Sequence, residues 1–144
     1  MMKVSMGRYP KDHNKKRKVE VRIDKYDVWS LDHTLALIIA PALKVMRENL
    51  LGAPLIDDED VPEELRRPKS FDVAEFWTDP NWHNRWEYVL DEMIFAFENH
   101  ANIDWVEQFY PDNGPADKVG LEAHMARMAN GRRLFAKYYD GLWT

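Results

Sequence analysis

The segment from Trp82 to Phe97 constrains the fold most, because its apolar residues recur at the spacing of an α-helix. They form two adjoining rows along one face: Trp82, Trp86, Val89, Met93 and Ala96, and beside them Leu90, Ile94 and Phe97. Asp79 followed by Pro80 is typical of a helix N-terminus, since proline needs no amide partner in the first turn. We therefore predict an amphipathic helix over about residues 80–99.

Two further long helices are predicted on the same grounds. Residues 31–52 follow a serine that can cap the helix, and their apolar side chains lie nearly all round, which favours a central, buried helix. Pro41 should kink it, and Gly52 should end it. The last helix spans about residues 116–140, with one row that includes a charge: Leu121, Met125, Met128, Arg132, Phe135 and Tyr139.

Shorter elements connect these helices. Asp60 can cap a short helix that Pro68 ends, and residues 71–77 suggest one more apolar-faced turn. Residues 1–18 are polar and interrupted by glycine and proline, so we predict a flexible basic arm without regular structure. Alternation at residues 19–24 predicts at most one short, half-buried strand. The expected fold is mainly α: a compact single-domain helical bundle over residues 19–144.

The charge distribution limits the partners. Residues 1–22 hold eight basic and two acidic residues, a net charge of +6, whereas the other 122 residues carry −11. An acidic body argues against broad nucleic-acid binding. The sequence has no cysteine, which excludes disulfides and Cys-ligated metals. The longest uncharged run is far shorter than the roughly 20 residues of a membrane-spanning helix, so we expect a soluble, intracellular protein.

Two charges interrupt otherwise apolar rows and therefore need partners. Arg132 lies between Met128 and Phe135, and Asp32 begins a row of the first helix. A buried charge is costly unless it is paired, so these side chains form a buried ion pair, with each other or with Glu92, or they face a ligand. A further alternative is that the stem of Arg132 lies on apolar surface while its guanidinium stays in water. The sequence leaves these alternatives open.

A nucleotide-like anion is one ligand that these residue types fit. The start of the first helix offers free amides beside Asp32 and His33, although a plainly capped helix start explains the same residues. Cations beside aromatic rings hold phosphates and stack bases, although the same aromatic residues commonly fill a core. The candidate ligand-binding residues are Asp32, His33, Trp82, Arg85, Trp86, Arg132, Arg133 and Tyr139.

A divalent metal is an alternative reading. His83, Glu87 and Asp91 recur every four residues along one helix face, and their donor atoms suit magnesium or manganese, although a solvated face carries such groups as well. No nucleophile elbow or phosphate-binding glycine loop is present in the sequence, so we predict no catalytic residue and no other cofactor.

Four segments together carry a family resemblance: residues 23–44, 52–66, 85–99 and 130–143, which read IDKYDVWSLDHTLALIIAPALK, GAPLIDDEDVPEELR, RWEYVLDEMIFAFEN and NGRRLFAKYYDGLW. In this order they resemble a family of small, uncharacterised accessory proteins encoded by tailed bacteriophages. The resemblance covers about residues 19–144. It implies a protein that acts in the cytoplasm of an infected bacterial host, and it implies no activity.

Three functions remain open at this point. The first is a non-catalytic accessory protein that sequesters a nucleotide-like signalling ligand of host immunity, by analogy with other phage proteins, or that inhibits a host protein. The second is a phosphohydrolase in which His83, Glu87 and Asp91 hold a metal ion whose bound water attacks phosphorus. The third is a virion or assembly component, and self-association into a homo-oligomer is compatible with each of them.

Overall fold

The computed structural model describes residues 1–68 and 79–143, and the apolar turn predicted at residues 71–77 lies outside them. Three long helices dominate the chain, and the prediction of a mainly α fold is confirmed. In chain order the elements are β1 (Lys3–Met6), β2 (Val19–Arg22), α1 (Leu31–Glu48), η1 (Asp58–Asp60), η2 (Glu63–Leu65), α2 (Trp82–Ala101), η4 (Trp105–Phe109), α3 (Lys118–Lys137) and η5 (Tyr139–Gly141), where η marks a 3-10 helix.

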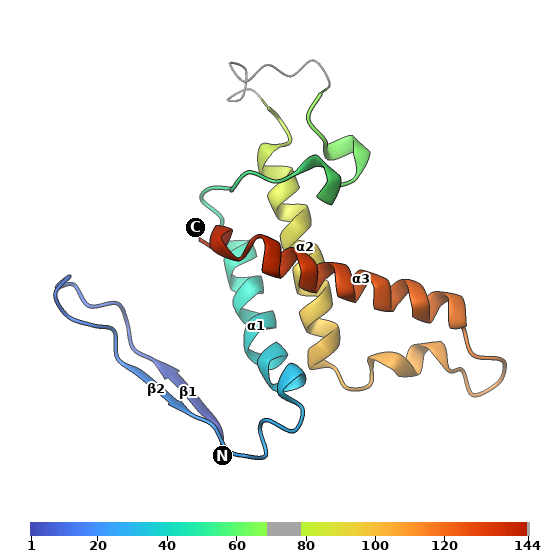
Figure 1. Ribbon diagram of the computed structural model, residues 1–144, viewed down its shortest axis with the longest axis horizontal. Coiled ribbons are helices and arrows are strands. Elements are labelled where there is room, and N and C mark those ends of the chain that lie inside the picture. The colour runs from blue at the N-terminus through green and yellow to red at the C-terminus, as the bar shows by residue number, and fades with distance from the viewer. Residues whose placement is uncertain (69–78, 144) are drawn as a thin grey trace.

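The central helix is α2, which packs against both α1 and α3 (Figure 1). Its buried residues include most of the two predicted apolar rows: Arg85, Trp86, Val89, Leu90, Glu92, Met93, Ala96 and Phe97. The helix begins at Trp82, slightly later than predicted, because the carboxylate of Asp79 accepts the backbone N–H of Asn81 at 3.0 Å before the first helical turn. Asn81 is therefore the residue that precedes the helix, and the amphipathic pattern is confirmed.

Helix α1 is peripheral, and our prediction that it is the central helix is wrong. Ala36, Ala40 and Leu43 are buried on the side that faces α2, but the neighbouring apolar row stays exposed. Leu35 and Val45 in that outer row are 45% and 61% exposed. Helix α1 carries two adjacent apolar rows along its surface, and only one of them packs against α2.

Helices α2 and α3 approach each other closely at Gly131. A Cβ atom placed on Gly131 would lie 2.3 Å from the carbonyl oxygen of Glu92 and 2.5 Å from the Cβ of Ala96. The absence of a side chain at Gly131 therefore allows the backbone of α3 to lie close to the backbone of α2 and to the side chain of Ala96.

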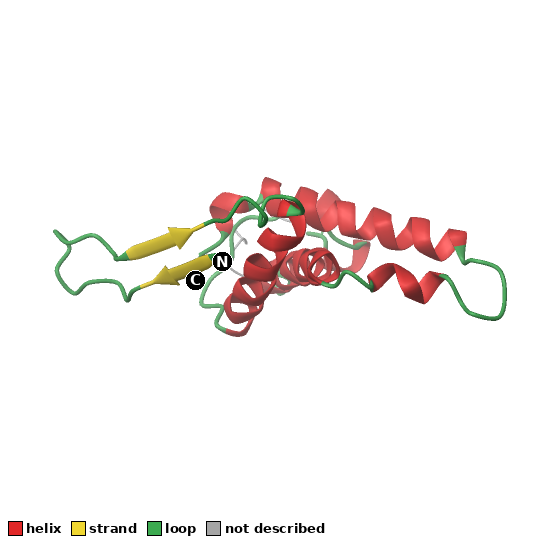
Figure 2. Ribbon diagram, turned by 90° about the horizontal axis from the view of Figure 1, so that it is seen from below, coloured by secondary structure: helices red, strands yellow, loops and turns green. Residues whose placement is uncertain are grey.

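The N-terminal segment forms a hairpin that extends away from the helices (Figures 1 and 2). Strands β1 and β2 pair antiparallel, with Lys3 opposite Arg22 and Met6 opposite Val19. Two expectations are corrected here: residues 1–18 include a strand, and the strand at residues 19–22 is mostly exposed. Strand β1 has only two alternating apolar residues, Val4 and Met6. A pattern this short does not identify a strand in the sequence alone.

Candidate functional site

The residues predicted to form one ligand site lie in five separate places. Arg85 and Trp86 belong to the core, and Trp82 lines a pocket beside Trp143. Asp32, His33 and Arg132 lie around His100. Arg133 contacts Asp60, and Tyr139 lines a groove between α1 and the end of α3. The folded chain thus brings three of the eight residues together.

Arg85 holds the segment that precedes α2. Its side chain is fully buried and forms an ion pair with Asp79, which is also buried, and its Nη1 donates to the carbonyl oxygen of Leu65 at 3.0 Å. Burial opposes ionisation of Asp79, but the hydrogen bonds from Arg85 and from the Asn81 backbone outweigh it and lower the pKa of Asp79. Arg85 therefore has no exposed surface for a phosphate.

Both predicted tryptophans have structural contacts. Trp86 is fully buried and makes an edge contact with Tyr138, with ring centroids 6.4 Å apart. Trp82 donates its indole N–H to the carbonyl oxygen of Ala53 at 3.2 Å and lines a pocket of about 460 Å³. The described residues that line this pocket include Asp79 and His83 but no lysine or arginine, so the pocket offers no permanently charged cation to an anionic ligand.

A buried carboxylate joins η1 to the end of α3. Asp60 accepts hydrogen bonds from Arg133 at 2.6 Å, from Lys137 at 2.6 Å and from the Tyr138 hydroxyl at 2.5 Å. The same hydroxyl accepts the backbone N–H of Asp57 at 3.0 Å. Burial opposes ionisation of Asp60, but these hydrogen bonds lower its pKa below the ordinary value. Burial and the hydrogen bond to Asp60 raise the pKa of Tyr138 to about 12.

One group of acidic side chains in the described part of the chain brings three ligand atoms within 4.8 Å of one another: Asp57, Glu59 and Asp60. The ammonium of Lys137 lies among them, 2.8 Å from Asp57, 3.2 Å from Glu59 and 2.6 Å from Asp60. Its hydrogen bonds, that to Asp57 foremost, raise the pKa of Lys137. A lysine thus supplies the positive charge that this acidic group attracts.

The predicted metal row on α2 does not converge in this way. Arg47 of α1 pairs with Glu87 at 3.4 Å and with Asp91 at 2.9 Å, and His83 lines the pocket beside Trp82. The structure therefore uses these two carboxylates to connect α1 to α2.

His100, which is not among the residues predicted from the sequence, is the centre of the group that does come together. Arg132 donates to its Nε2 at 2.5 Å, and His33 donates from Nδ1 to its backbone carbonyl at 3.0 Å. Burial and the charge of Arg132 lower the pKa of His100, whereas the charge of Asp32 raises it. Glu92, the other predicted partner of Arg132, pairs with Arg127 at 2.9 Å.

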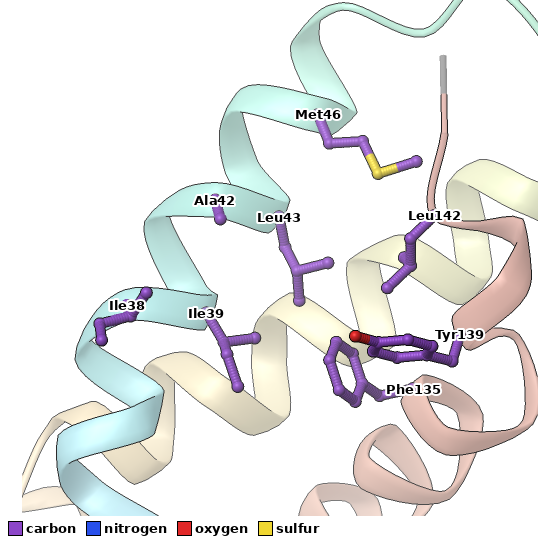
Figure 3. Close-up of a pocket in the computed structure, with 8 residues that line it drawn as sticks. All are labelled: Ile38, Ile39, Ala42, Leu43, Met46, Phe135, Tyr139 and Leu142. Atoms are coloured by element: carbon purple, nitrogen blue, oxygen red, sulfur yellow. The ribbon is translucent and has the colours of Figure 1, made fainter. Parts of the chain in front are cut away.

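A concave, largely apolar surface contains Tyr139, and we call it the α1–α3 groove. Its volume is about 410 Å³, within the range of ligand-binding clefts. Figure 3 shows three side chains of α1 pointing toward three from the end of α3 and the segment after it: Ile39, Leu43 and Met46 on one side, and Phe135, Tyr139 and Leu142 on the other. The lining residues are Ile38, Ile39, Ala42, Leu43, Met46, Phe135, Tyr139 and Leu142.

No protein-family model matches this chain, and neither a curated protein nor a solved structure matches it. None of the described helices is both long enough and apolar enough to cross a membrane.

Proposed function

We propose that this chain is a non-catalytic accessory protein that binds a host protein, and that the α1–α3 groove receives an amphipathic helix of that protein. The observation that carries the proposal is the groove itself: all eight described lining residues are apolar or aromatic. A helix with apolar side chains at spacings of three and four fits a groove of this kind. Tyr139 is 62% exposed at its edge, so a partner can bury it. The resemblance to phage accessory proteins supports a bacterial host as the source of the partner.

The pairing of the cations favours a protein partner over a nucleotide. Arg85 and Arg133 each bind a buried carboxylate, on Asp79 and Asp60 respectively, and Arg132 binds His100. A phosphate that took Arg85 would leave the buried carboxylate of Asp79 without its ion-pair partner, which is costly. A phosphate that took Arg133 would remove one of the three donors to the buried carboxylate of Asp60. The predicted stacking residue Tyr139 lies in the groove, in apolar rather than cationic surroundings.

The test selects helical peptides against the full-length chain from a displayed library and measures their affinity by fluorescence anisotropy. The variants Tyr139→Glu and Met46→Glu place a carboxylate in the groove, and Tyr110→Glu is the control, because Tyr110 is similarly exposed but does not line the groove. We expect both groove variants to weaken binding at least about 10-fold, as loss of a central apolar anchor does, with the control unchanged.

Two results would overturn this proposal. One is a set of selected peptides that bind the groove variants as tightly as the wild type. The other is a nucleotide that raises the melting temperature, is recovered intact after denaturation and loses its effect in Arg132→Gln. That second result would restore the sequestration hypothesis.

A further inference from the structure

The hairpin has one apolar face that no described segment of the chain covers. Residues directly opposite each other in an antiparallel pair point to the same face, so Val4 lies beside Val21 and Met6 beside Val19. These four side chains are between 39% and 58% exposed. The opposite face is polar and carries an ion pair between Lys3 and Glu20 at 2.8 Å. A two-stranded sheet is marginally stable alone, so this apolar face is expected to pack against something.

The linker between β2 and α1 keeps the hairpin away from its own α1. The Thr34 hydroxyl donates to the carbonyl oxygen of Asp27 at 2.8 Å, and the Asp24 backbone N–H donates to the Asp27 carboxylate at 2.8 Å. These bonds order the chain where it turns into the helix, and the hairpin extends outward from that point (Figure 2). The described helices of the same chain therefore leave the apolar face of the hairpin exposed.

The N-terminal half of α1 offers a surface of matching length. Leu31, Leu35 and Ile38 follow one another at spacings of four and three and are 42%, 45% and 37% exposed. From Leu31 to Ile38 the helix rises by about 10 Å, and a four-residue strand such as β1 also spans about 10 Å. Trp29, just before the helix, is 78% exposed and extends this surface, which we call the α1 seat.

Charge selects among the ways in which two copies could meet. The hairpin turn, residues 7–18, holds six basic and one acidic residue, whereas residues 23–38 around the α1 seat hold three acidic and one basic residue. A hairpin on the α1 seat therefore brings opposite charges together. Two hairpins packed on each other would instead join two turns that each carry a net charge of +5, and two α1 seats would join two acidic surfaces.

We propose that the partner of the hairpin is a second copy of this chain. The apolar face of each hairpin packs on the α1 seat of the other copy, which gives a two-fold dimer with two identical junctions. This dimer surface is distinct from the α1–α3 groove except for Ile38, which borders both.

The test measures the mass of the full-length chain by analytical ultracentrifugation. The wild type is expected to be a dimer, and Val21→Glu on the hairpin and Leu35→Glu on the α1 seat are each expected to be monomers. The control Ser5→Glu adds the same charge to the polar face of the hairpin and should remain dimeric. All three positions are exposed, so circular dichroism should show that the variants are folded. If one is not, Val19→Glu replaces Val21→Glu on the hairpin, and Leu31→Glu replaces Leu35→Glu on the α1 seat.

Mixing the two monomeric variants tests the exchange itself. The hairpin of Leu35→Glu and the α1 seat of Val21→Glu are both intact, so the mixture should form a heterodimer through one junction. Added salt should weaken the wild-type dimer, because it screens the attraction between the basic turn and the acidic seat.

Three results would overturn the proposal. The first is a wild type that is monomeric at every concentration. The second is a Leu35→Glu variant that stays dimeric, which indicates hairpin-to-hairpin pairing, and the third is a Val21→Glu variant that stays dimeric, which indicates pairing through α1. The outcome is independent of the groove, because Tyr139→Glu should still form the dimer.

Discussion

Arg132 donates a hydrogen bond to Nε2 of His100 at 2.5 Å, which makes this nitrogen an acceptor and places the proton of the neutral ring on Nδ1. Asp32 acts on the same imidazole in the opposite sense: burial and Arg132 lower the pKa of His100, and Asp32 raises it. The two charges that interrupt apolar rows in the sequence thus act on the same histidine.

The pKa of His100 should move in opposite directions in two variants. Arg132→Gln removes a positive charge and should raise the pKa toward 6.5, while Asp32→Asn removes a negative charge and should lower it further. An NMR titration of the imidazole resonances measures both shifts. The internal control is His124, whose pKa burial and Arg127 lower, and which neither variant should affect. Shifts of the same sign in both variants would contradict this electrostatic arrangement.

The same shift has a consequence for stability. Because the folded-state pKa of His100 lies below the value of 6.5 for an unperturbed histidine, the unfolded chain takes up the proton first as the pH falls. The free energy of unfolding therefore decreases as the pH falls below about 6.5 and through the folded-state pKa. Arg132→Gln should reduce this pH dependence, which urea unfolding at several pH values would measure.

Asp60→Asn should destabilise the fold more than any change to an exposed acidic residue. The Asp60 side chain is 1% exposed and binds Arg133, Lys137 and Tyr138, so loss of its charge should lower the free energy of unfolding by about 2–3 kcal/mol, after allowance for the partial exposure of both cations. Asp58→Asn is the control, because its ion pair with Arg67 at 3.2 Å is more exposed and should contribute below about 1 kcal/mol. Equal losses in the two variants would contradict this ranking.

The pH dependence of that contribution follows from the lowered pKa of Asp60. Its stabilising effect is present above the unfolded-state pKa of 3.8 and is lost as the pH falls through the folded-state pKa. Wild type and Asp60→Asn should therefore converge in stability in strong acid, as urea unfolding at descending pH would show.

The success of the α2 prediction and the failure of the α1 prediction have one physical cause. Periodicity shows which side chains avoid water, and in α2 one apolar face meets both neighbouring helices. Helix α1 has two apolar rows, and the sequence does not distinguish a row that packs inside the chain, such as Ala36 and Leu43, from one left outside, such as Leu35 and Val45. An apolar pattern on all sides therefore indicates either a central helix or a helix with a second partner.

The contacts of the candidate site residues were predictable only in part, because they also depend on how the helices pack. The expectation of a buried ion pair at Arg132 is wrong, because the side chain of Arg132 is exposed, and its contact with His100 depends on tertiary packing. His100 lies at the end of α2, outside its apolar rows, and Asp79 lies only six residues before Arg85, yet neither spacing identifies the contact. The residues of the α1–α3 groove follow ordinary core periodicity, so only the packing shows which of them remain open.

Gly131→Ala should destabilise the chain, even though the helix propensity of alanine is more favourable than that of glycine by about 1 kcal/mol. The added methyl group would lie 2.3 Å from the Glu92 carbonyl oxygen and 2.5 Å from the Ala96 Cβ, so α2 and α3 must separate or bend. Overpacking of this kind costs about 1–3 kcal/mol, and contact with backbone on α2 leaves no flexible side chain to move aside. The expected net result is a lower free energy of unfolding, measured by urea denaturation. Ala129→Gly on the exposed side of α3 is the matched control, since it should cost only the helix propensity. A Gly131→Ala variant more stable than the wild type would show that the two helices are not packed this closely.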